Sequence, residues 1–437
     1  MAQLPQIPKG QELEEFVAAW YQSSGYFVEK NITDERGPEQ VLELDVVVTD
    51  YELGLPRTRV AEVKSGGWGF SDIFKVLGWM TYLDLQYGAF FTTSQPPKKD
   101  IDFVRNKSKS FGLDFVCCPT IEFQNVAAAF QPVTGQPTPD EISVTVWRFA
   151  YWVERKLIEV LRDVHRRHPD RSSAKEAVEY FRLINNGIFF EKDVRDRAQA
   201  LYDAYQKHPK LTASAAAEIA GLEYDAVDHP KASEVMRSAL LNGEHPLLQA
   251  CMYLEHRARL GILKAAVDYL CLSRNGLVGA KTEKWNGFEN GKWFSDLLPE
   301  SFKRGMETLA KSPSFLRFPY FWQVFLWCWG GFYLFDRQEQ EFMELSRQTG
   351  VPKDEIPAAL SALDKLFPTS GGWLKNQQPN SQALIVKMVP AQFRGIGAYQ
   401  RMLRYGIEEY RELGYSDHTN SDLVKWHNAG VHLLDNT

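Results

Sequence analysis

Asp45 and the tripeptide Glu62-Val63-Lys64 are the residues of this chain whose types and spacing best suit chemistry. Both lie in Val-rich stretches, and side chains two apart share one face of a strand. Glu62 and Lys64 therefore point the same way, and antiparallel pairing of the two stretches brings Asp45 beside Glu62. Carboxylates on such a sheet are costly unless they are paired or bind a cation. The pattern indicates a divalent metal site and hydrolysis of a phosphodiester.

A compact α/β unit over residues 1–122 is expected to position these residues. Periodicity and turn residues predict the element order αβββαβαβ. The turn between the second and third strands contains Asp50, Gly54 and Pro56, and Ser71 is the expected N-cap of the second helix. The predicted elements are helix 11–23, strands 26–32, 44–48 and 60–64, a helix from residue 71, strand 89–93, helix 100–111 and strand 113–117.

Beyond this unit the chain reads as helical. Residues 131–140 contain three prolines and one glycine, which is linker composition, so we expect domains at 1–130 and 141–437. A Gly-rich loop at 275–290 is a candidate division of the second domain. The expected helices are 146–165, 173–183, 194–206, 213–219, 233–241, 245–272, 302–310, 339–349, 353–366 and 399–413.

Charge and cysteine content limit the class of protein. The net charge is −6, and residues 1–130 carry all of it, with 12 Lys and Arg against 18 Asp and Glu. This balance argues against a protein that coats nucleic acid non-specifically. Five cysteines without a CxxC pattern, and no basic and apolar leader at the N-terminus, favour a reducing, cytoplasmic location.

One uncharged aromatic stretch, residues 318–335, reaches the minimum length of a membrane span. Pro319, Gln323 and the Gly330-Gly331 pair interrupt it. We therefore predict a buried helix or helix-turn in a globular core, with a membrane-associated effector as the alternative.

The ordered residues resemble the PD-(D/E)XK nuclease superfamily, close to its restriction-endonuclease-like and archaeal Holliday-junction-resolvase-like branches. The resemblance covers roughly the first quarter of the chain and rests on residues 10–17, 25–28, 44–47 and 62–65. It implies a mixed central sheet flanked by helices and a metal-dependent nuclease. DNA is favoured over RNA as the substrate, and endonuclease over exonuclease activity. A homodimer and a role in defence against foreign nucleic acid are further expectations.

In this resemblance Asp45, Glu62 and the backbone carbonyl of Val63 hold Mg²⁺, for which Mn²⁺ can substitute. Magnesium prefers hard oxygen ligands and keeps several waters, so these donors and a substrate phosphate suffice. Lys64 would orient the attacking water and offset charge developing in the transition state. The non-functional alternative is an exposed salt bridge between Lys64 and a neighbouring carboxylate, which contributes little to stability.

The family also places a glutamate on the first helix. The apolar stripe of that helix leaves Glu12 and Glu14 on its two flanks and Glu15 nearly opposite, where it should be solvated. The family's spacing to Gly25 selects Glu14 as the site residue. The alternative for Glu14 is a first-turn acid that complements the helix dipole.

Several residues near this set have two readings. Gly66 and Gly67 either admit a phosphate backbone or only form a turn. Trp68 and Phe70 either stack on bases or pack in the core. A basic cluster in the first domain either binds backbone phosphates or forms a solvated helix face. A second basic cluster is expected to be an exposed patch at a helix end. These clusters are Lys98, Lys99, Arg105, Lys107 and Lys109, and then Arg162, His165, Arg166, Arg167, His168 and Arg171.

The sequence thus predicts a Mg²⁺-dependent nuclease with an N-terminal α/β domain and a helical C-terminal region. The rival from another class is a nucleic-acid-binding or scaffold protein that retains the nuclease fold without turnover.

Overall fold

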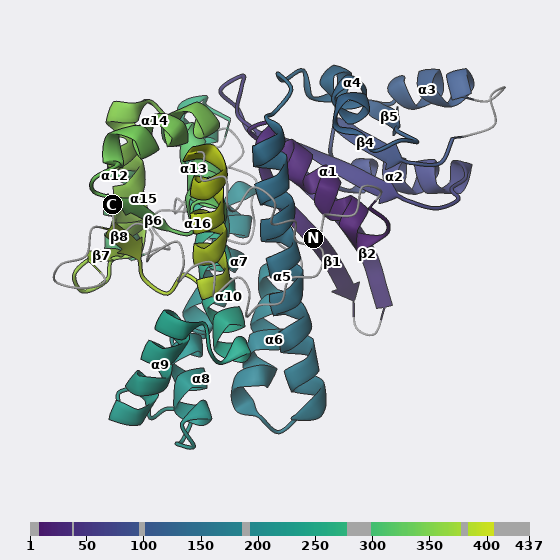
Figure 1. The fold of residues 1–437 in the computed structure, drawn as a ribbon. Helices are drawn as coiled ribbons and strands as arrows, with labels where there is room; N and C mark the ends of the chain where they lie inside the picture. The colour runs from purple at the N-terminus through teal and green to yellow at the C-terminus, as the bar shows by residue number, and fades with distance from the viewer. Residues whose placement is uncertain are drawn as a thin grey trace. The chain divides into compact units, whose positions relative to one another are not determined.

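The computed structural model describes residues 8–36, 39–95, 101–185, 193–277, 299–376 and 383–405. Contacts divide the chain into two compact units, the first essentially residues up to Trp152 and the second from Val153 onward. Figure 1 labels the helices and strands of both units.

The first unit is built on a five-stranded mixed sheet with the order β1-β2-β3-β4-β5. The first three strands are antiparallel, whereas β3, β4 and β5 run parallel. The predicted sequence of elements is confirmed, and β1 and β2 extend beyond their predicted ends. The strands are β1 (Phe27–Arg36), β2 (Glu39–Asp50), β3 (Arg57–Lys64), β4 (Tyr87–Thr92) and β5 (Leu113–Cys117).

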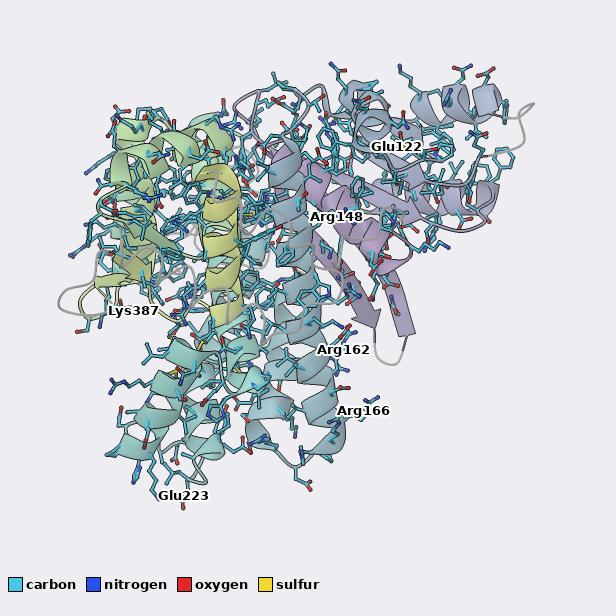
Figure 2. All side chains as sticks on the ribbon, in the orientation of Figure 1. Glu122, Arg148, Arg162, Arg166, Glu223 and Lys387 are labelled. Atoms are coloured by element: carbon cyan, nitrogen blue, oxygen red, sulfur yellow. The ribbon has the colours of Figure 1, made fainter. Side chains whose placement is uncertain are left out.

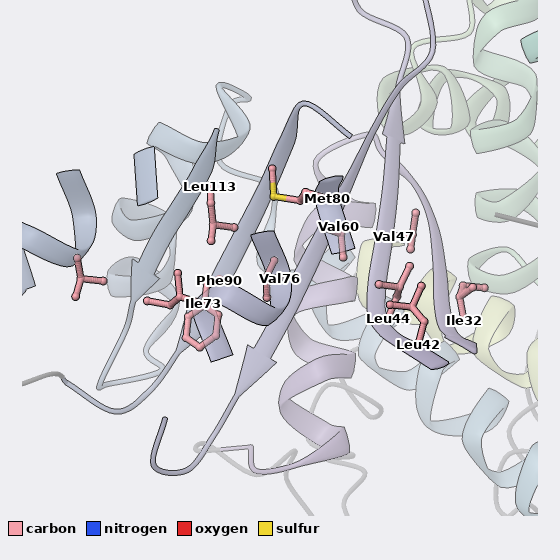
Figure 3. Packing of buried hydrophobic residues seen from close by; sticks show 11 residues of the cluster. Ile32, Leu42, Leu44, Val47, Val60, Ile73, Val76, Met80, Phe90 and Leu113 are labelled. Carbon is pink, nitrogen blue, oxygen red and sulfur yellow. The ribbon is translucent and has the colours of Figure 1, made fainter. Parts of the chain in front are cut away.

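Helices cover both faces of this sheet. Phe90 of β4 belongs to the core under α2 (Phe70–Tyr82) and α3 (Ile101–Lys109), together with Val76 and Val104 (Figure 3). The next residue, Phe91, points the opposite way and contacts Phe130 of α4 (Phe123–Thr134). Trp20 of α1 (Gln11–Ser23) also packs on Phe130. Successive side chains of one strand therefore pack into two cores, one under α2 and α3 and the other under α1 and α4.

The predicted start of α2 is wrong by two residues. The helix begins at Phe70, so Ser71 lies inside its first turn and is not the N-cap. The carboxylate of Asp72 accepts the Gly69 N–H at 2.8 Å. A carboxylate in the first turn satisfies an amide at the start of the helix and complements the helix dipole.

The expected linker is partly helix. α4 continues to Thr134 and ends at Gly135, whose φ of 66° is left-handed. Its last carbonyls bind the sheet, because Tyr26 donates to the Thr134 carbonyl and Arg59 to the Val133 carbonyl, each at 3.0 Å. Composition cannot reveal such acceptors. The contact-based division falls later than predicted, inside α5 (Glu141–Arg167).

The second unit is mainly helical, as predicted, and adds a three-stranded sheet in the order β6-β8-β7 that was not predicted. α10 is buried around nearly its whole circumference, which is typical of a central core helix. Most of the predicted loop at 275–290 lies outside the described residues. The elements are α6 (Ser172–Asn185), α7 (Val194–Lys207), α8 (Leu211–Ile219), α9 (Pro230–Asn242), α10 (Pro246–Arg274), α12 (Glu300–Leu309), η2 (Phe315–Arg317), α13 (Phe318–Gln323), η3 (Val324–Cys328), β6 (Phe332–Leu334), α14 (Gln338–Thr349), η4 (Lys353–Glu355), α15 (Ile356–Leu366), β7 (Leu374–Asn376), β8 (Ala383–Val386) and α16 (Ala391–Tyr405).

The aromatic stretch forms α13, the π-helical turn η3 and strand β6 within the core of this unit. Trp322 and Trp329 are fully buried, and the indole N–H of Trp322 donates to the Ala359 carbonyl at 2.8 Å. This confirms the predicted buried helix-turn. In the described part of the chain, no helix combines the length and apolarity needed to cross a membrane.

A buried ion pair holds the end of this stretch. Arg401 of α16 pairs with Glu341 of α14 at 2.6 Å, and their side chains are 2% and 0% exposed. Arg401 also donates to the carbonyls of Trp329 and Phe332, and Glu341 accepts the Leu334 N–H. One guanidinium thereby connects three elements of the second unit.

We expect Glu341→Ala to lower the free energy of unfolding by about 3–5 kcal/mol, because it leaves a buried guanidinium uncompensated. Glu339→Ala removes an acid of the same helix that is 73% exposed, and should change stability by less than about 1 kcal/mol. Urea unfolding of both variants tests this, and equal losses would contradict the assigned role of the pair.

Candidate active site

Strands β2 and β3 separate beside Asp45, and the candidate site lies at this fork. Their ladder runs from Asp50 opposite Arg57 to Val46 opposite Ala61, while β3 continues along β4 as far as Lys64. Where the ladder ends, Oδ2 of Asp45 accepts the Val63 N–H at 2.9 Å. A carboxylate thus replaces the backbone carbonyl that a continuing ladder would supply. The predicted placement of Asp45 beside the Glu62–Lys64 segment is confirmed.

Glu62 and Lys64 share one face of β3, as period-two alternation requires. The Lys64 ammonium lies 2.6 Å from Oε1 of Glu62. A second cation, Lys75 of α2, lies 3.7 Å from the same oxygen. Glu62 is 1% exposed, and Lys64 and Lys75 are 30% and 48% exposed. The alternative prediction, an exposed salt bridge of Lys64, therefore does not describe Glu62, because its carboxylate is buried.

The second oxygen of Glu62 has a different environment. Oε2 is buried and has no hydrogen-bond partner among the described residues. Buried carboxylate oxygens are normally satisfied, because leaving one without a partner costs about 1–3 kcal/mol. An acceptor of this kind beside Asp45 is the feature that a bound cation would complete.

The electrostatics agree with this asymmetry. Burial, and then the nearby charges of Glu62 and Glu14, raise the pKa of Asp45 to about 8, against the lowering effect of the Val63 N–H and Lys64. Burial alone would lower the pKa of Lys64, but its hydrogen bond to Glu62 and the charge of Asp45 raise it. At Asp45 the effects of burial and of the two neighbouring carboxylates outweigh those of the Val63 N–H and Lys64, which favours a proton or a cation there.

These residues fit a hard divalent cation. Asp45 and Glu62 supply carboxylate oxygens, and Val63 between Glu62 and Lys64 supplies the backbone carbonyl that the resemblance implies. Within the described ranges no group of three or more His, Cys, Asp or Glu could hold a metal. Magnesium suits such a sparse donor set, since waters and substrate phosphate complete its shell.

Glu14 is held near this pair by the start of α1. The Gly10 N–H donates to the hydroxyl of Ser65 at 2.9 Å, and the Ser65 carbonyl accepts from Thr93 at 3.2 Å. The residue after the site lysine thus anchors the helix that carries Glu14. Burial raises the pKa of Glu14, Lys30 lowers it, and Glu43 and Glu62 are among the carboxylates that raise it.

The expectation for Glu15 is wrong. Its side chain is 4% exposed, because α1 is buried on nearly all sides from Glu15 to Gln22. The apolar stripe marks only one covered side of the helix. Elements further along the chain cover the others: Arg148 of α5 lies over the Phe16 ring at 5.1 Å.

The aromatic residues after Lys64 divide between the two readings. Trp68 packs against Phe90 and Phe115 and donates to the Ser94 carbonyl at 2.9 Å, so its ring belongs to the core. Phe70 is 45% exposed. Phe70 is therefore the more exposed of the two, whereas Trp68 is partly buried against the core.

The basic clusters are solvated. Lys98 and Lys99 lie outside the described residues, whereas Arg105, Lys107 and Lys109 are exposed on α3. In the second cluster, Arg162 and Arg166 project from α5 (Figure 2), and Arg166 pairs with Asp163 at 2.7 Å. The prediction of an exposed helix-end patch is confirmed for this second cluster.

Two lysines near the site were not predicted. Lys75 reaches Glu62 from α2, and Lys30 of β1 is 4% exposed, with its ammonium 4.6 Å from the Tyr151 ring. Strand alternation could have marked Lys30, because it assigns this residue to one face of β1 with the buried Val28 and Ile32. No local pattern marks Lys75, because the packing of α2 on β3 is what brings it to Glu62.

Comparisons with protein-family models, curated proteins and solved structures found no match to this chain.

We expect Asp45→Asn to stabilise the metal-free protein at alkaline pH. Asparagine retains an acceptor for the Val63 N–H but removes the charge. The pKa of Asp45 rises from an ordinary 3.8 to about 8 on folding, so wild type loses stability as the pH rises through this window. Asparagine should remove part of this destabilisation, about 1–2 kcal/mol. This gain would raise Tm by about 2–8 °C at pH 8 and by little near pH 4.

Thermal scans in EDTA at both pH values measure this difference. The control is Asp84→Asn, because Asp84 is exposed and has a left-handed backbone conformation. A stabilisation that is equal at both pH values would contradict the assigned electrostatics.

Proposed function

We propose that the chain is a divalent-metal-dependent nuclease that hydrolyses phosphodiester bonds at the β2–β3 fork. The observation that carries the proposal is the pair of half-buried Asp45 and buried Glu62, with one Glu62 oxygen that has no partner among the described residues and the other paired with Lys64. The mixed sheet with helices on both faces is the architecture expected of a restriction-endonuclease-like domain, which we also propose.

In this proposal Asp45, Glu62 and the Val63 carbonyl hold Mg²⁺ or Mn²⁺. A bound ion of this kind polarises a phosphoryl oxygen and lowers the pKa of a coordinated water. The Val63 N–H fixes the Asp45 carboxylate in place. Preorganisation of this kind avoids reorganisation when charge develops at the phosphate.

Lys64 would orient the attacking water and stabilise charge on the scissile phosphate. Its charged form is secured by Glu62, and it is 30% exposed, so its ammonium is accessible to substrate. Lys75 shares Oε1 of Glu62 and adds positive charge at the solvent side. Both cations thus face the position in which a phosphate anion would bind.

DNA is the proposed substrate by resemblance, with endonuclease action, a homodimer, a cytoplasmic location and a role in defence as further parts of the hypothesis. The rival is a binding or scaffold protein without turnover. The intact site favours catalysis, because a scaffold has no need for a buried Glu62 beside Asp45, whose pKa the charge of Glu62 raises.

We expect Asp45→Ala and Lys64→Ala each to reduce metal-dependent cleavage at least about 100-fold, as for loss of one transition-state stabiliser. Cleavage of linear, circular, single-stranded and branched DNA, and of RNA, in Mg²⁺ or Mn²⁺ is the measurement. Asp84→Asn should retain full activity. Binding that persists without metal, and no cleavage by wild type, would support the scaffold instead.

Glu14 is expected to support metal binding from α1. Glu14→Gln should weaken Mg²⁺ or Mn²⁺ dependence by about 10-fold or more, as for other groups that position metal ligands. Glu12→Gln is the matched control on the same helix turn and should leave the metal titration unchanged. Equal effects of the two substitutions would assign both acids to the helix dipole.

A further inference from the structure

Four phenylalanines of α2 and α3, and of the residue pair that follows α3, are exposed to solvent. Phe70, Phe74, Phe103 and Phe111 are 45%, 65%, 60% and 54% exposed. Phe70 and Phe103 meet edge to face across the two helices at 6.2 Å. Phe70 and Phe103 thus form a contiguous pair of exposed rings, and contiguous exposed apolar surface is typical of interaction sites.

Cations are interleaved with these rings. Arg105, Lys107 and Lys109 are exposed on α3, and the Lys107 ammonium lies 5.0 Å from the Phe111 ring. Residues 1–130 carry an excess of acid, with 12 Lys and Arg against 18 Asp and Glu. Three cations on one short helix therefore form a local basic region on an acidic domain. The aromatic–cation face is defined here by Phe70, Phe74, Phe103, Arg105, Lys107 and Phe111.

This face borders the candidate site. Phe74 is the sequence neighbour of Lys75, which lies 3.7 Å from Glu62. Phe70 opens α2 only six residues after Lys64. A strand whose phosphate lies beside Lys64 and Lys75 would find these rings within the next few nucleotides.

We propose that the aromatic–cation face binds the bases of a single-stranded or locally unpaired nucleic acid. Rings interspersed with cations form a stacking platform, on which unpaired bases expose their π faces and phosphates meet Lys and Arg. In a duplex the base faces are covered by their neighbours, so the rings would gain no contact. A second copy of this chain fits less well, because a two-fold interface centred on this face would bring two basic faces together, whereas a phosphate backbone complements their charge.

The inference names the substrate class of the proposed nuclease and rests on that function only for its link to cleavage. Binding is testable alone. Anisotropy of labelled single-stranded DNA, single-stranded RNA and the corresponding duplexes, with the full chain in EDTA, should show preference for the single strands. The DNA and RNA arms show whether the sugar is also read.

We expect Phe74→Ala and Phe103→Ala each to weaken single-strand binding about 5- to 100-fold, the range found for loss of one stacking contact. Duplex affinity and thermal stability should not change. Lys107→Ala should instead reduce the slope of log affinity against log salt by about one. Leu53→Ala is the matched control, since Leu53 is an exposed apolar residue, 73% accessible, in the β2–β3 turn.

Equal affinity for duplex and single strands, or single-strand binding unaffected by both phenylalanine substitutions, would overturn the inference. A change in sedimentation without a change in affinity would assign the face to self-association and overturn it also. If wild type cleaves nothing while Phe74→Ala still weakens single-strand binding, the nuclease proposal fails and this inference stands. Cleavage lost in Lys64→Ala but binding unaltered in Phe74→Ala gives the reverse result.

Discussion

The hydrogen bond from the Val63 N–H to Asp45 is the interaction on which the candidate site depends. Where β2 and β3 part, the backbone of β3 would otherwise present an unsatisfied amide at the sheet's interior. Asp45 satisfies it and is fixed in orientation by it. Because β3 continues along β4, Glu62 and Lys64 stay in register while β2 bends away. The end of the β2–β3 ladder therefore brings Asp45 beside the segment that carries Glu62 and Lys64.

The two carboxylate oxygens of Glu62 have different surroundings. Both lysines approach the same oxygen of Glu62, while the other oxygen is buried and has no hydrogen-bond partner among the described residues. A purely structural ion pair would gain more from satisfying both oxygens, since buried charges contribute to stability only with good geometry and complete hydrogen bonding. At this site the described residues therefore satisfy the buried Glu62 on one oxygen only, and its charge raises the pKa of the neighbouring Asp45.

The second unit uses buried charge for the opposite purpose. Glu341 and Arg401 satisfy each other and several backbone groups, and they fix the aromatic turn of η3 and β6 inside a helical core. Its exposed basic patch on α5 is partly neutralised by Asp163. These features belong to the second unit, whereas the candidate site and the exposed rings of Phe70, Phe74, Phe103 and Phe111 belong to the first unit.

The sequence by itself determined the order of elements in the first unit and the shared face of Glu62 and Lys64. Both follow from local periodicity, because a strand alternates every two residues whatever it packs against. It also determined that residues 318–335 form an interrupted, buried segment, since prolines and glycines break a span locally. Only the tertiary structure decided the bond from Val63 to Asp45, the approach of Lys75, the burial of Glu15 and the helical end of the presumed linker. Each of these features depends on packing between elements that are far apart in the sequence, and no local pattern contains that information.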